Sequence, residues 1–137
     1  ESYANAIGLM QLILPTARAA ASYHRQRVDR RALQRPATNI RLGTTFLAFL
    51  RRAFDKVPPL VIAGYNAGHG AVYRWLRNYR GNTLDELSER IPYDQTRRYS
   101  KRVLASFFAY TVLWGRKDVP RIGLKLPKVK RQRFRRR

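Results

Sequence analysis

The spacing of the apolar residues constrains the fold of this chain more than any other feature. Between Asn39 and Phe54, apolar side chains recur at near-helical intervals, which predicts an amphipathic helix with Thr38 or Asn39 as its cap. A second long helix is predicted from Asp94 to Trp114, with an apolar face made of Tyr99, Val103, Phe107, Tyr110 and Leu113. No stretch shows the alternation typical of a strand. The sequence therefore predicts an all-α body.

Shorter segments connect these helices. Pro15 is expected to separate a short helix ending near Leu12 to Leu14 from a second helix that starts at Pro15 or Thr16. Residues 28–37 are polar and arginine-rich, and we interpret them as a linker that Pro36 closes. The glycines of residues 66–70 are expected to stop one helix and to allow another to begin. A short helix is predicted at residues 84–89, with Asp85 and Glu86 in its first turn, and Asp94 is expected to cap the last helix.

Charge divides the 137-residue chain into two regions. The whole sequence holds 29 Lys and Arg against 8 Asp and Glu, a formal net charge of +21, and residues 116–137 contain 11 of the basic residues and one acidic residue, Asp118. We therefore predict a folded domain over residues 1–115 and a basic, disordered C-terminal tail over residues 116–137. The 45% hydrophobic content is enough for the body to fold. Without cysteine and with two distant histidines, the chain offers no metal site, and no cofactor is expected.

Three segments, in order, carry a recognisable pattern. They are Gly8-Leu9-Met10-Gln11, Ala63-Gly64-Tyr65-Asn66-Ala67-Gly68, and the run from Glu89 through Ile91-Pro92-Tyr93 to Tyr99. Together they resemble the soluble lytic transglycosylases, lysozyme-like enzymes that cleave the glycan strand of peptidoglycan. The resemblance covers residues 2–114 and implies an all-α, lysozyme-like muramidase lobe. Two positions depart from the pattern: Gly64 stands where alanine or serine is common, and Gln95 stands where glutamate is usual.

The same resemblance bears on the general acid. In the family, a glutamate followed by serine lies about fifteen residues before the glycine of Gly-Leu-Met-Gln, whereas the Glu1-Ser2 pair lies only seven residues before Gly8. Residues 2–8 fit the intervening stretch, with Asn5 in place of a glycine. We therefore expect the lobe to be incomplete at its N-terminus, the general acid to lie upstream, and the chain to be inactive as given. The alternative is a shortened loop that makes Glu1 the acid.

The resemblance also implies roles for other residues. Ser2, Met10 and Gln11 are expected on the cleft floor, Tyr65 and Asn66 near the reacting sugar, and Glu89 as an assisting cleft residue. For these residues, ordinary structural roles stay open: Met10 and Tyr65 as core residues, Asn66 and Gly68 as the turn that presents Tyr65, and Glu89 as a solvated carboxylate at a helix end. His69 is expected to be an exposed loop residue. Among the other carboxylates none suits a general acid, which needs apolar surroundings.

The implied reaction cleaves the β-1,4 bond between N-acetylmuramic acid and N-acetylglucosamine and gives a 1,6-anhydromuramyl end. One glutamate acts first as acid and then as base, so no metal or cofactor is needed. The expected partners are peptidoglycan glycan strands, with an anionic polymer or a membrane surface as a partner of the tail. We expect a monomer in the bacterial cell envelope or periplasm, without a specific nucleic-acid partner. The alternative function is a basic module that binds nucleic acid or another anionic polymer.

Overall fold

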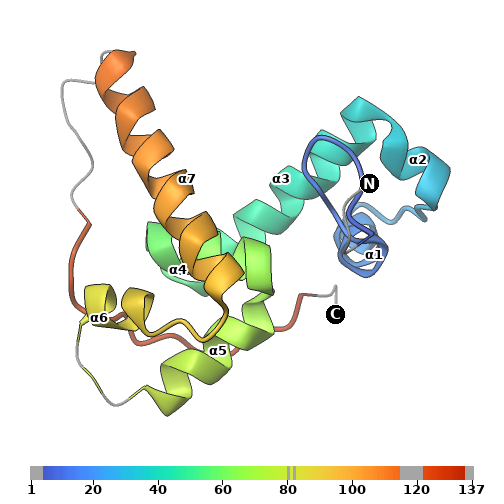
Figure 1. Cartoon of the computed structure of the whole chain (residues 1–137). Coiled ribbons are helices and arrows are strands. Elements are labelled where there is room, and N and C mark those ends of the chain that lie inside the picture. The colour runs from blue at the N-terminus through green and yellow to red at the C-terminus, as the bar shows by residue number, and fades with distance from the viewer. Residues whose placement is uncertain (1–4, 80, 82, 115–121, 135–137) are drawn as a thin grey trace. The chain divides into compact units, whose positions relative to one another are not determined.

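The computed structural model describes residues 5–79, 81, 83–114 and 122–134, and this part of the chain is helical without a strand. Its helices are α1 (Leu14–Tyr23), α2 (Arg30–Gln34), α3 (Pro36–Ala53), α4 (Pro58–Ala67), α5 (His69–Asn78), α6 (Leu84–Glu89) and α7 (Asp94–Leu113) (Figure 1). The all-α prediction is confirmed. None of the described helices is both long and apolar enough to cross a membrane.

The chain divides into two compact units, each with its own core. The first unit comprises residues 1–49 and 132–137, and the second comprises residues 50–131, so that the boundary falls within α3. The predicted division into residues 1–115 and 116–137 stays a prediction about domain organisation.

In the first unit, small side chains let α1 come close to its neighbours. Ala17, Ala20 and Ala21 are buried on one side of α1, and Leu33 of α2 and Leu42 of α3 are buried as well. Two sequence expectations are wrong here. Residues 8–11 form a turn rather than a short helix, and part of the supposed linker is α2.

Local hydrogen bonding explains the presence of α2. Asp29 caps this helix, because its carboxylate accepts a hydrogen bond of 2.7 Å from the backbone N–H of Ala32. The fully buried Leu33 then ties the short helix to the core. Pro36 begins α3 instead of closing a linker, which agrees with the preference of proline for the first helical turn. Asn39 is therefore inside α3 and is not its cap.

In the second unit, α4 packs against both α5 and α7 (Figure 1). Pro59, Leu60, Val61 and Ala63 are buried on α4, and the ring of Phe54 lies 5.1 Å from that of Tyr73 on α5. Gly68 ends α4 and precedes α5 with φ 83°, a conformation that strongly favours glycine. The prediction that glycine is needed in this turn is confirmed.

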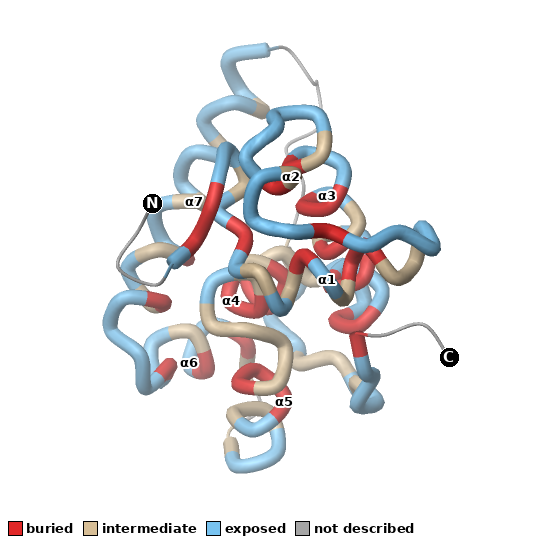
Figure 2. Tube along the Cα trace, turned by 90° about the vertical axis from the view of Figure 1, so that its right-hand side faces the viewer, coloured by how far each residue is buried: buried red, intermediate tan, exposed pale blue. Residues whose placement is uncertain are grey.

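Only the first half of α7 contributes buried residues, namely Thr96 and Ser100. The predicted apolar face is not buried beyond them, because Phe107 is 41%, Tyr110 59% and Leu113 72% exposed. Figure 2 shows α7 mostly in the pale blue and tan of exposed and intermediate residues. Helix length gives the reason: α7 has 20 residues and α4 has 10, so α4 can cover about half of α7 at 1.5 Å per residue.

The C-terminal segment, residues 122–134, differs from the expected disordered tail. In the second unit, the backbone N–H of Leu84 donates to the Leu124 carbonyl at 2.6 Å, and the Tyr73 hydroxyl donates to the Lys130 carbonyl at 3.2 Å. In the first unit, Phe134 is buried among the rings of Tyr23, Phe46 and Phe49, with centroid distances of 5.3, 4.9 and 4.7 Å. Charge alone suggested disorder, but apolar residues interspersed with the arginines anchor this segment.

Candidate active site

Met10 and Gln11 lie on a tight turn between residues 7 and 12. Ile7 and Leu12 pair across the turn through two backbone hydrogen bonds of 3.0 and 3.1 Å. Gly8 and Gln11 both have positive φ, 72° and 48°, which prevents a helix from forming over these residues. The Gln11 side chain folds back, because its Nε2 donates to the Gly8 carbonyl at 2.9 Å.

The buried side chain of Asn39 holds this turn in place. Its Nδ2 donates to the carbonyls of Ile7 at 2.8 Å and Leu33 at 3.0 Å, and its Oδ1 accepts from the backbone N–H of Met10 at 2.7 Å. One amide group thus satisfies three backbone groups from two segments of the first unit. Sequence reasoning offered Asn39, besides Thr38, as a cap. Its place among the apolar positions of a helical pattern was the signal that it would be buried.

A second contact fixes Met10. A Cβ atom added at Gly43 would lie 2.7 Å from both Cβ and Cγ of Met10, so α3 approaches the Met10 side chain where glycine leaves room. Met10 is half-buried, and Gln11 is exposed. The structure therefore combines a packing role for Met10 with an exposed amide at Gln11.

Tyr65 and Asn66 lie in the last turn of α4. The Asn66 Oδ1 accepts a hydrogen bond of 2.7 Å from the hydroxyl of the buried Thr96, which ties the end of α4 to the first turns of α7. Burial, followed by the neighbouring Tyr99, raises the pKa of Tyr65 to about 12. The phenol of Tyr65 therefore keeps its proton at neutral pH and can donate a hydrogen bond to a ligand.

The departure at Gly64 has a structural explanation. A Cβ atom at this position would lie 2.8 Å from Cε2 of Phe54 and 3.1 Å from Cδ2 of Leu50. Phe54 is completely buried, so its ring has little freedom to move. The large phenylalanine thus occupies the space that an alanine at position 64 would need.

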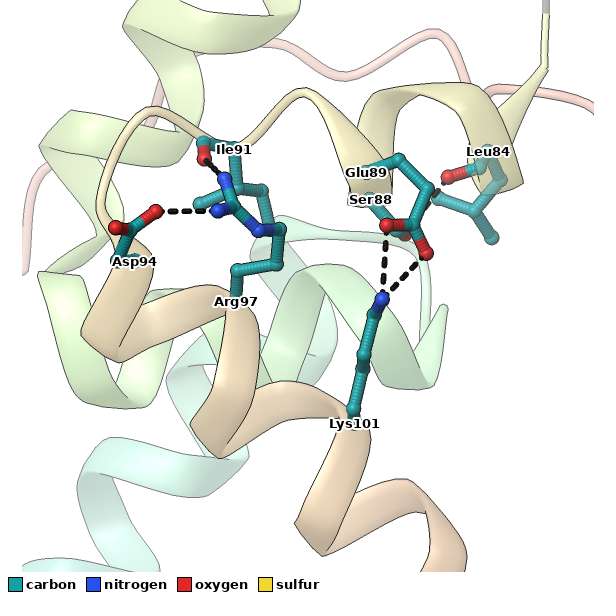
Figure 3. Close-up of polar contacts among 7 residues, drawn as sticks. All are labelled: Leu84, Ser88, Glu89, Ile91, Asp94, Arg97 and Lys101. Atoms are coloured by element: carbon teal, nitrogen blue, oxygen red, sulfur yellow. Dashed lines mark hydrogen bonds and ion pairs between the residues drawn. The ribbon is translucent and has the colours of Figure 1, made fainter.

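Glu89 is the last residue of α6 and forms an ion pair with Lys101 of α7, at 2.7 and 2.8 Å from its two carboxylate oxygens to Nζ (Figure 3). Both side chains are more than half exposed. An exposed ion pair of this kind contributes little to stability, about 0–1 kcal/mol. Glu89 is thus an accessible carboxylate at a helix end, in surroundings unlike the apolar pocket that a general acid needs.

The next turn of the chain is held by Arg97. Its guanidinium donates to the Ile91 carbonyl at 2.9 Å and also to the Asp94 carboxylate (Figure 3). Tyr93 is the N-cap of α7 and Asp94 is the first helical residue, so the expectation that Asp94 caps this helix is wrong. The Asp94 carboxylate pairs with Arg97 within α7, and the hydrogen bond from Arg97 to the Ile91 carbonyl ties α7 to the joint that follows α6. Within α6 itself, the Ser88 hydroxyl donates to the Leu84 carbonyl at 2.7 Å.

His69 also differs from its prediction as an exposed loop residue. It is the first residue of α5 and is half-buried. Burial, with a second contribution from the charge of Arg131, lowers its pKa below the usual value of a histidine. The ring therefore favours its neutral form. Among the described residues, no three His, Asp or Glu side chains form a group that could hold a metal ion.

The structure distributes the predicted site residues over the two units. Met10 and Gln11 belong to the first unit, and Tyr65, Asn66 and Glu89 belong to the second. Glu1 and Ser2 lie outside the described residues. That these side chains line one groove stays a prediction. Sequence reasoning missed Thr96 and Lys101 as partners of Asn66 and Glu89, although both lie in or beside the third motif.

Comparisons with known proteins agree with the motifs. Residues 1–87 match the family described as Transglycosylase SLT domain. The putative soluble lytic murein transglycosylase of Haemophilus influenzae is 37% identical over 120 residues, which are 86% of this chain and 20% of that protein. The membrane-bound lytic murein transglycosylase C of Haemophilus ducreyi is 37% identical over 98 residues, or 64% of this chain and 27% of that protein.

A solved structure shows the same fold. The crystal structure of lytic transglycosylase Slt from Pseudomonas aeruginosa, an inactive glutamate-to-glutamine mutant, aligns with a TM-score of 0.74 and 35% identity. The alignment covers 83% of this chain and 19% of that one. This chain spans about a fifth of the length of the first curated relative that it matches. By the match over residues 1–87, more than half of its length, the chain belongs to the Transglycosylase SLT domain family.

Proposed function

We propose that this chain is the catalytic-type domain of a peptidoglycan lytic transglycosylase. The reaction of such a domain cleaves the β-1,4 bond between N-acetylmuramic acid and N-acetylglucosamine and gives a 1,6-anhydromuramyl end. Because no residue of this chain is assigned as the general acid, we expect residues 1–137 alone to be inactive. The observation that carries the proposal is the family match over residues 1–87, which contains two of the three sequence motifs. The relatives' names, which include soluble and membrane-bound murein transglycosylases, support murein as the substrate.

The reaction needs one carboxyl group in two successive roles. A glutamic acid first donates its proton to the glycosidic oxygen as the bond to C1 of the muramyl unit breaks. The resulting carboxylate then takes the proton of the muramyl 6-hydroxyl while O6 bonds to C1, which closes the anhydro ring without a water molecule. The inactive glutamate-to-glutamine mutant of the Pseudomonas aeruginosa relative is consistent with such a requirement.

Glu1 and Glu89 are the two glutamates of this chain to test in that role. Glu89 is paired with Lys101 on the surface, so we assign it an assisting role at the edge of the site and not the proton transfer itself. Glu1 lies seven residues before Gly8, closer than the spacing of about fifteen residues at which the family pattern has its general acid, so we do not assign the proton transfer to Glu1 either.

The remaining predicted residues would hold the sugar. We assign the Tyr65 hydroxyl as a hydrogen-bond donor, because a phenol is protonated in the physiological range, and burial raises the pKa of Tyr65 further, to about 12. Gln11 offers an exposed amide next to Met10, and Ser2 is placed beside them by the motif. Asn66 contributes through the position of Tyr65, since its own Oδ1 is occupied by Thr96.

A digestion experiment tests the proposal. Purified sacculi are incubated with the full chain and with its Glu1→Gln, Glu89→Gln and Tyr65→Phe variants, and the products are separated and identified by mass. We expect residues 1–137 to release few 1,6-anhydromuropeptides. We also expect the chain to bind neutral chitooligosaccharide weakly, and the Tyr65→Phe variant to bind it more weakly still. Loss of a true general acid lowers the rate by about 10² to 10⁴.

The outcomes separate the assignments. Rapid anhydromuropeptide release that Glu1→Gln abolishes would make Glu1 the acid. Products with ordinary reducing ends would show hydrolysis and contradict the transglycosylase reaction. A folded chain that neither binds chitooligosaccharide nor releases any anhydro product would contradict the whole proposal. Glu86→Gln, another exposed glutamate on α6, is the matched control for Glu89→Gln.

We also propose a place of action and partners. A murein substrate places the protein in the bacterial cell envelope or periplasm, where it would act as a monomer on glycan strands. The net charge of +21 would concentrate it near anionic polymers or a membrane surface.

A further inference from the structure

A basic pocket of about 530 Å³ lies in the second unit between α5 and the C-terminal segment. Arg74 and Arg77 of α5 and Arg131 of the C-terminal segment line it, together with the apolar groups of Tyr73, Leu126 and Val129. None of these six residues belongs to the predicted active site. The volume falls within the range of about 300–1,000 Å³ that is usual for small-molecule sites.

Helix geometry explains the α5 wall of the basic pocket. Gly70, Tyr73, Arg74 and Arg77 follow one another at intervals that place them on a single face of the helix. The glycine leaves space beside the arginines, because a Cβ atom added at Gly70 would contact Arg74 Nη1 at 3.9 Å and no closer heavy atom. The helix therefore presents two guanidinium groups next to an open floor.

The opposite wall is held by specific contacts. The hydroxyl of Tyr73, whose side chain is 9% exposed, donates to the Lys130 carbonyl at 3.2 Å. Further along, the N–H of Leu84 donates to the Leu124 carbonyl. These two hydrogen bonds attach the C-terminal segment to the second unit on either side of Leu126 and Val129. Specific contacts therefore hold this wall of the basic pocket in place.

The basic pocket gathers positive charge that the described residues do not pair with carboxylates. In the described part of the chain, neither Arg74, Arg77 nor Arg131 forms an ion pair with a carboxylate. Arg74 and Arg77 are three residues apart on one helix face, where like charges repel each other. Burial lowers the pKa of the neighbouring His69, and the charge of Arg131 lowers it further. A bound anion would relieve this repulsion.

We propose that the basic pocket binds an anionic sugar unit, whose phosphate or carboxylate group is held by the guanidinium groups and whose ring lies against the apolar wall. Guanidinium groups are suited to both oxyanions, because their planar forks can donate two parallel hydrogen bonds. The volume exceeds the need of a bare oxyanion, and the apolar part of the lining suits a sugar ring. The choice of a sugar as the body of the ligand rests on the proposed function, whereas the choice of an oxyanion rests on the three arginines.

Binding measurements on the full chain test this inference. Proton–nitrogen NMR titrations with N-acetylglucosamine 6-phosphate, N-acetylmuramic acid, N-acetylglucosamine and inorganic phosphate give the dissociation constants. The test variant is Arg74→Gln/Arg77→Gln. The control is Arg51→Gln/Arg52→Gln, which removes two exposed arginines of the same unit from α3, outside the basic pocket. Both variants lower the net charge by two, so diffuse attraction changes equally in each.

We expect N-acetylglucosamine 6-phosphate, N-acetylmuramic acid or both to bind more tightly than N-acetylglucosamine and inorganic phosphate, with shifts in α5 and in residues 126–131. The test variant should weaken binding of the anionic sugars about tenfold or more, and the control less than twofold. Which of the two sugars binds identifies the oxyanion as phosphate or carboxylate.

Three results would overturn the inference. Equal losses in the test and control variants would show diffuse attraction only. Inorganic phosphate binding as tightly as N-acetylglucosamine 6-phosphate would leave no role for the sugar. Pocket-dependent binding of a DNA duplex without binding of either anionic sugar would assign the basic pocket to nucleic acid. Neutral chitooligosaccharide is titrated in parallel, so a failure of the proposed function appears there and not in the pocket measurement.

Discussion

Replacing Asn39 by alanine removes the amide that fixes the turn carrying Met10 and Gln11. The side chain makes three hydrogen bonds, to the Ile7 and Leu33 carbonyls and from the Met10 N–H, at 2.7–3.0 Å. Asn39 is completely buried, so alanine leaves these groups with poor access to water. At about 1–1.5 kcal/mol for each hydrogen bond, we expect a loss of about 3–4.5 kcal/mol in the free energy of unfolding.

A loss of this size is measurable against an ordinary domain stability of about 5–15 kcal/mol. Urea unfolding followed by circular dichroism gives the change from the transition midpoint. The control is Asn78→Ala on α5, where the asparagine is exposed and the expected change is within about 0.5 kcal/mol. A loss below about 1 kcal/mol for Asn39→Ala would refute the assignment of Asn39 as the support of the turn.

A double-mutant cycle with Gly8 sharpens the same test. A Cβ atom at Gly8 would lie 2.4 Å from Asn39 Nδ2, and the φ of 72° would strain any larger residue. Gly8→Ala should therefore be strongly destabilising in the natural chain and less so in the Asn39→Ala background, where only the backbone strain is left. Additive effects would show that the two residues do not interact and would contradict the geometry.

Four further changes test other parts of the structure. Gly64→Ala should destabilise the fold by about 1–2 kcal/mol, because the clash with Phe54 at 2.8 Å outweighs a helix-propensity gain of about 1 kcal/mol. Combining it with Phe54→Leu should recover most of the lost free energy of unfolding. A double variant that is no more stable than Gly64→Ala in urea would contradict the clash. Ser100→Ala should be neutral or stabilising, since the buried Oγ has no hydrogen-bond partner in the described part of the chain, and a thermal midpoint lowered by several degrees would contradict this. Phe134→Ala should cost about 2–4 kcal/mol and increase proteolysis of the C-terminal segment, whereas an unchanged midpoint would show that its aromatic contacts are not stabilising. Tyr65 should titrate near pH 12 in ultraviolet spectra, and Tyr65→Phe should remove that titration. Because the unfolded chain releases this proton at a lower pH than the folded chain, the free energy of unfolding should fall as the pH rises from about 10 towards 12. A titration midpoint near 10 would contradict the burial of Tyr65.

Local signals in the sequence were sufficient for the long helices and for one turn. The apolar repeat in residues 39–54 predicted the greater part of α3, and the repeat in residues 94–114 predicted α7 within one residue at its C-terminal end. The need for glycine at position 68 followed from the two flanking helices, and the observed φ of 83° agrees. These features depend on neighbours in the chain, so their causes are visible in the sequence.

Other features depend on partners far away in the chain. Thr96 and Asn66 are 30 residues apart, and Met10 and Asn39 are 29 residues apart. Sequence periodicity does not predict such pairs, because a hydrogen bond forms wherever the fold brings a donor close to an acceptor. The same holds for the basic pocket, whose arginines come from α5 and from the C-terminal segment.

The sequence by itself determined the helical class and, through three short motifs, the family. Tertiary structure decided which polar groups became internal supports and which apolar groups stayed outside. Asn39 is buried because Ile7, Leu33 and Met10 offer it partners, while Leu113 is exposed on a helix twice as long as α4. Phe134 is buried in a segment whose charge predicted disorder, because three aromatic rings of the first unit surround it. Burial depends on side chains that are distant in the sequence and meet only in the folded core, so the local order of residues does not predict it.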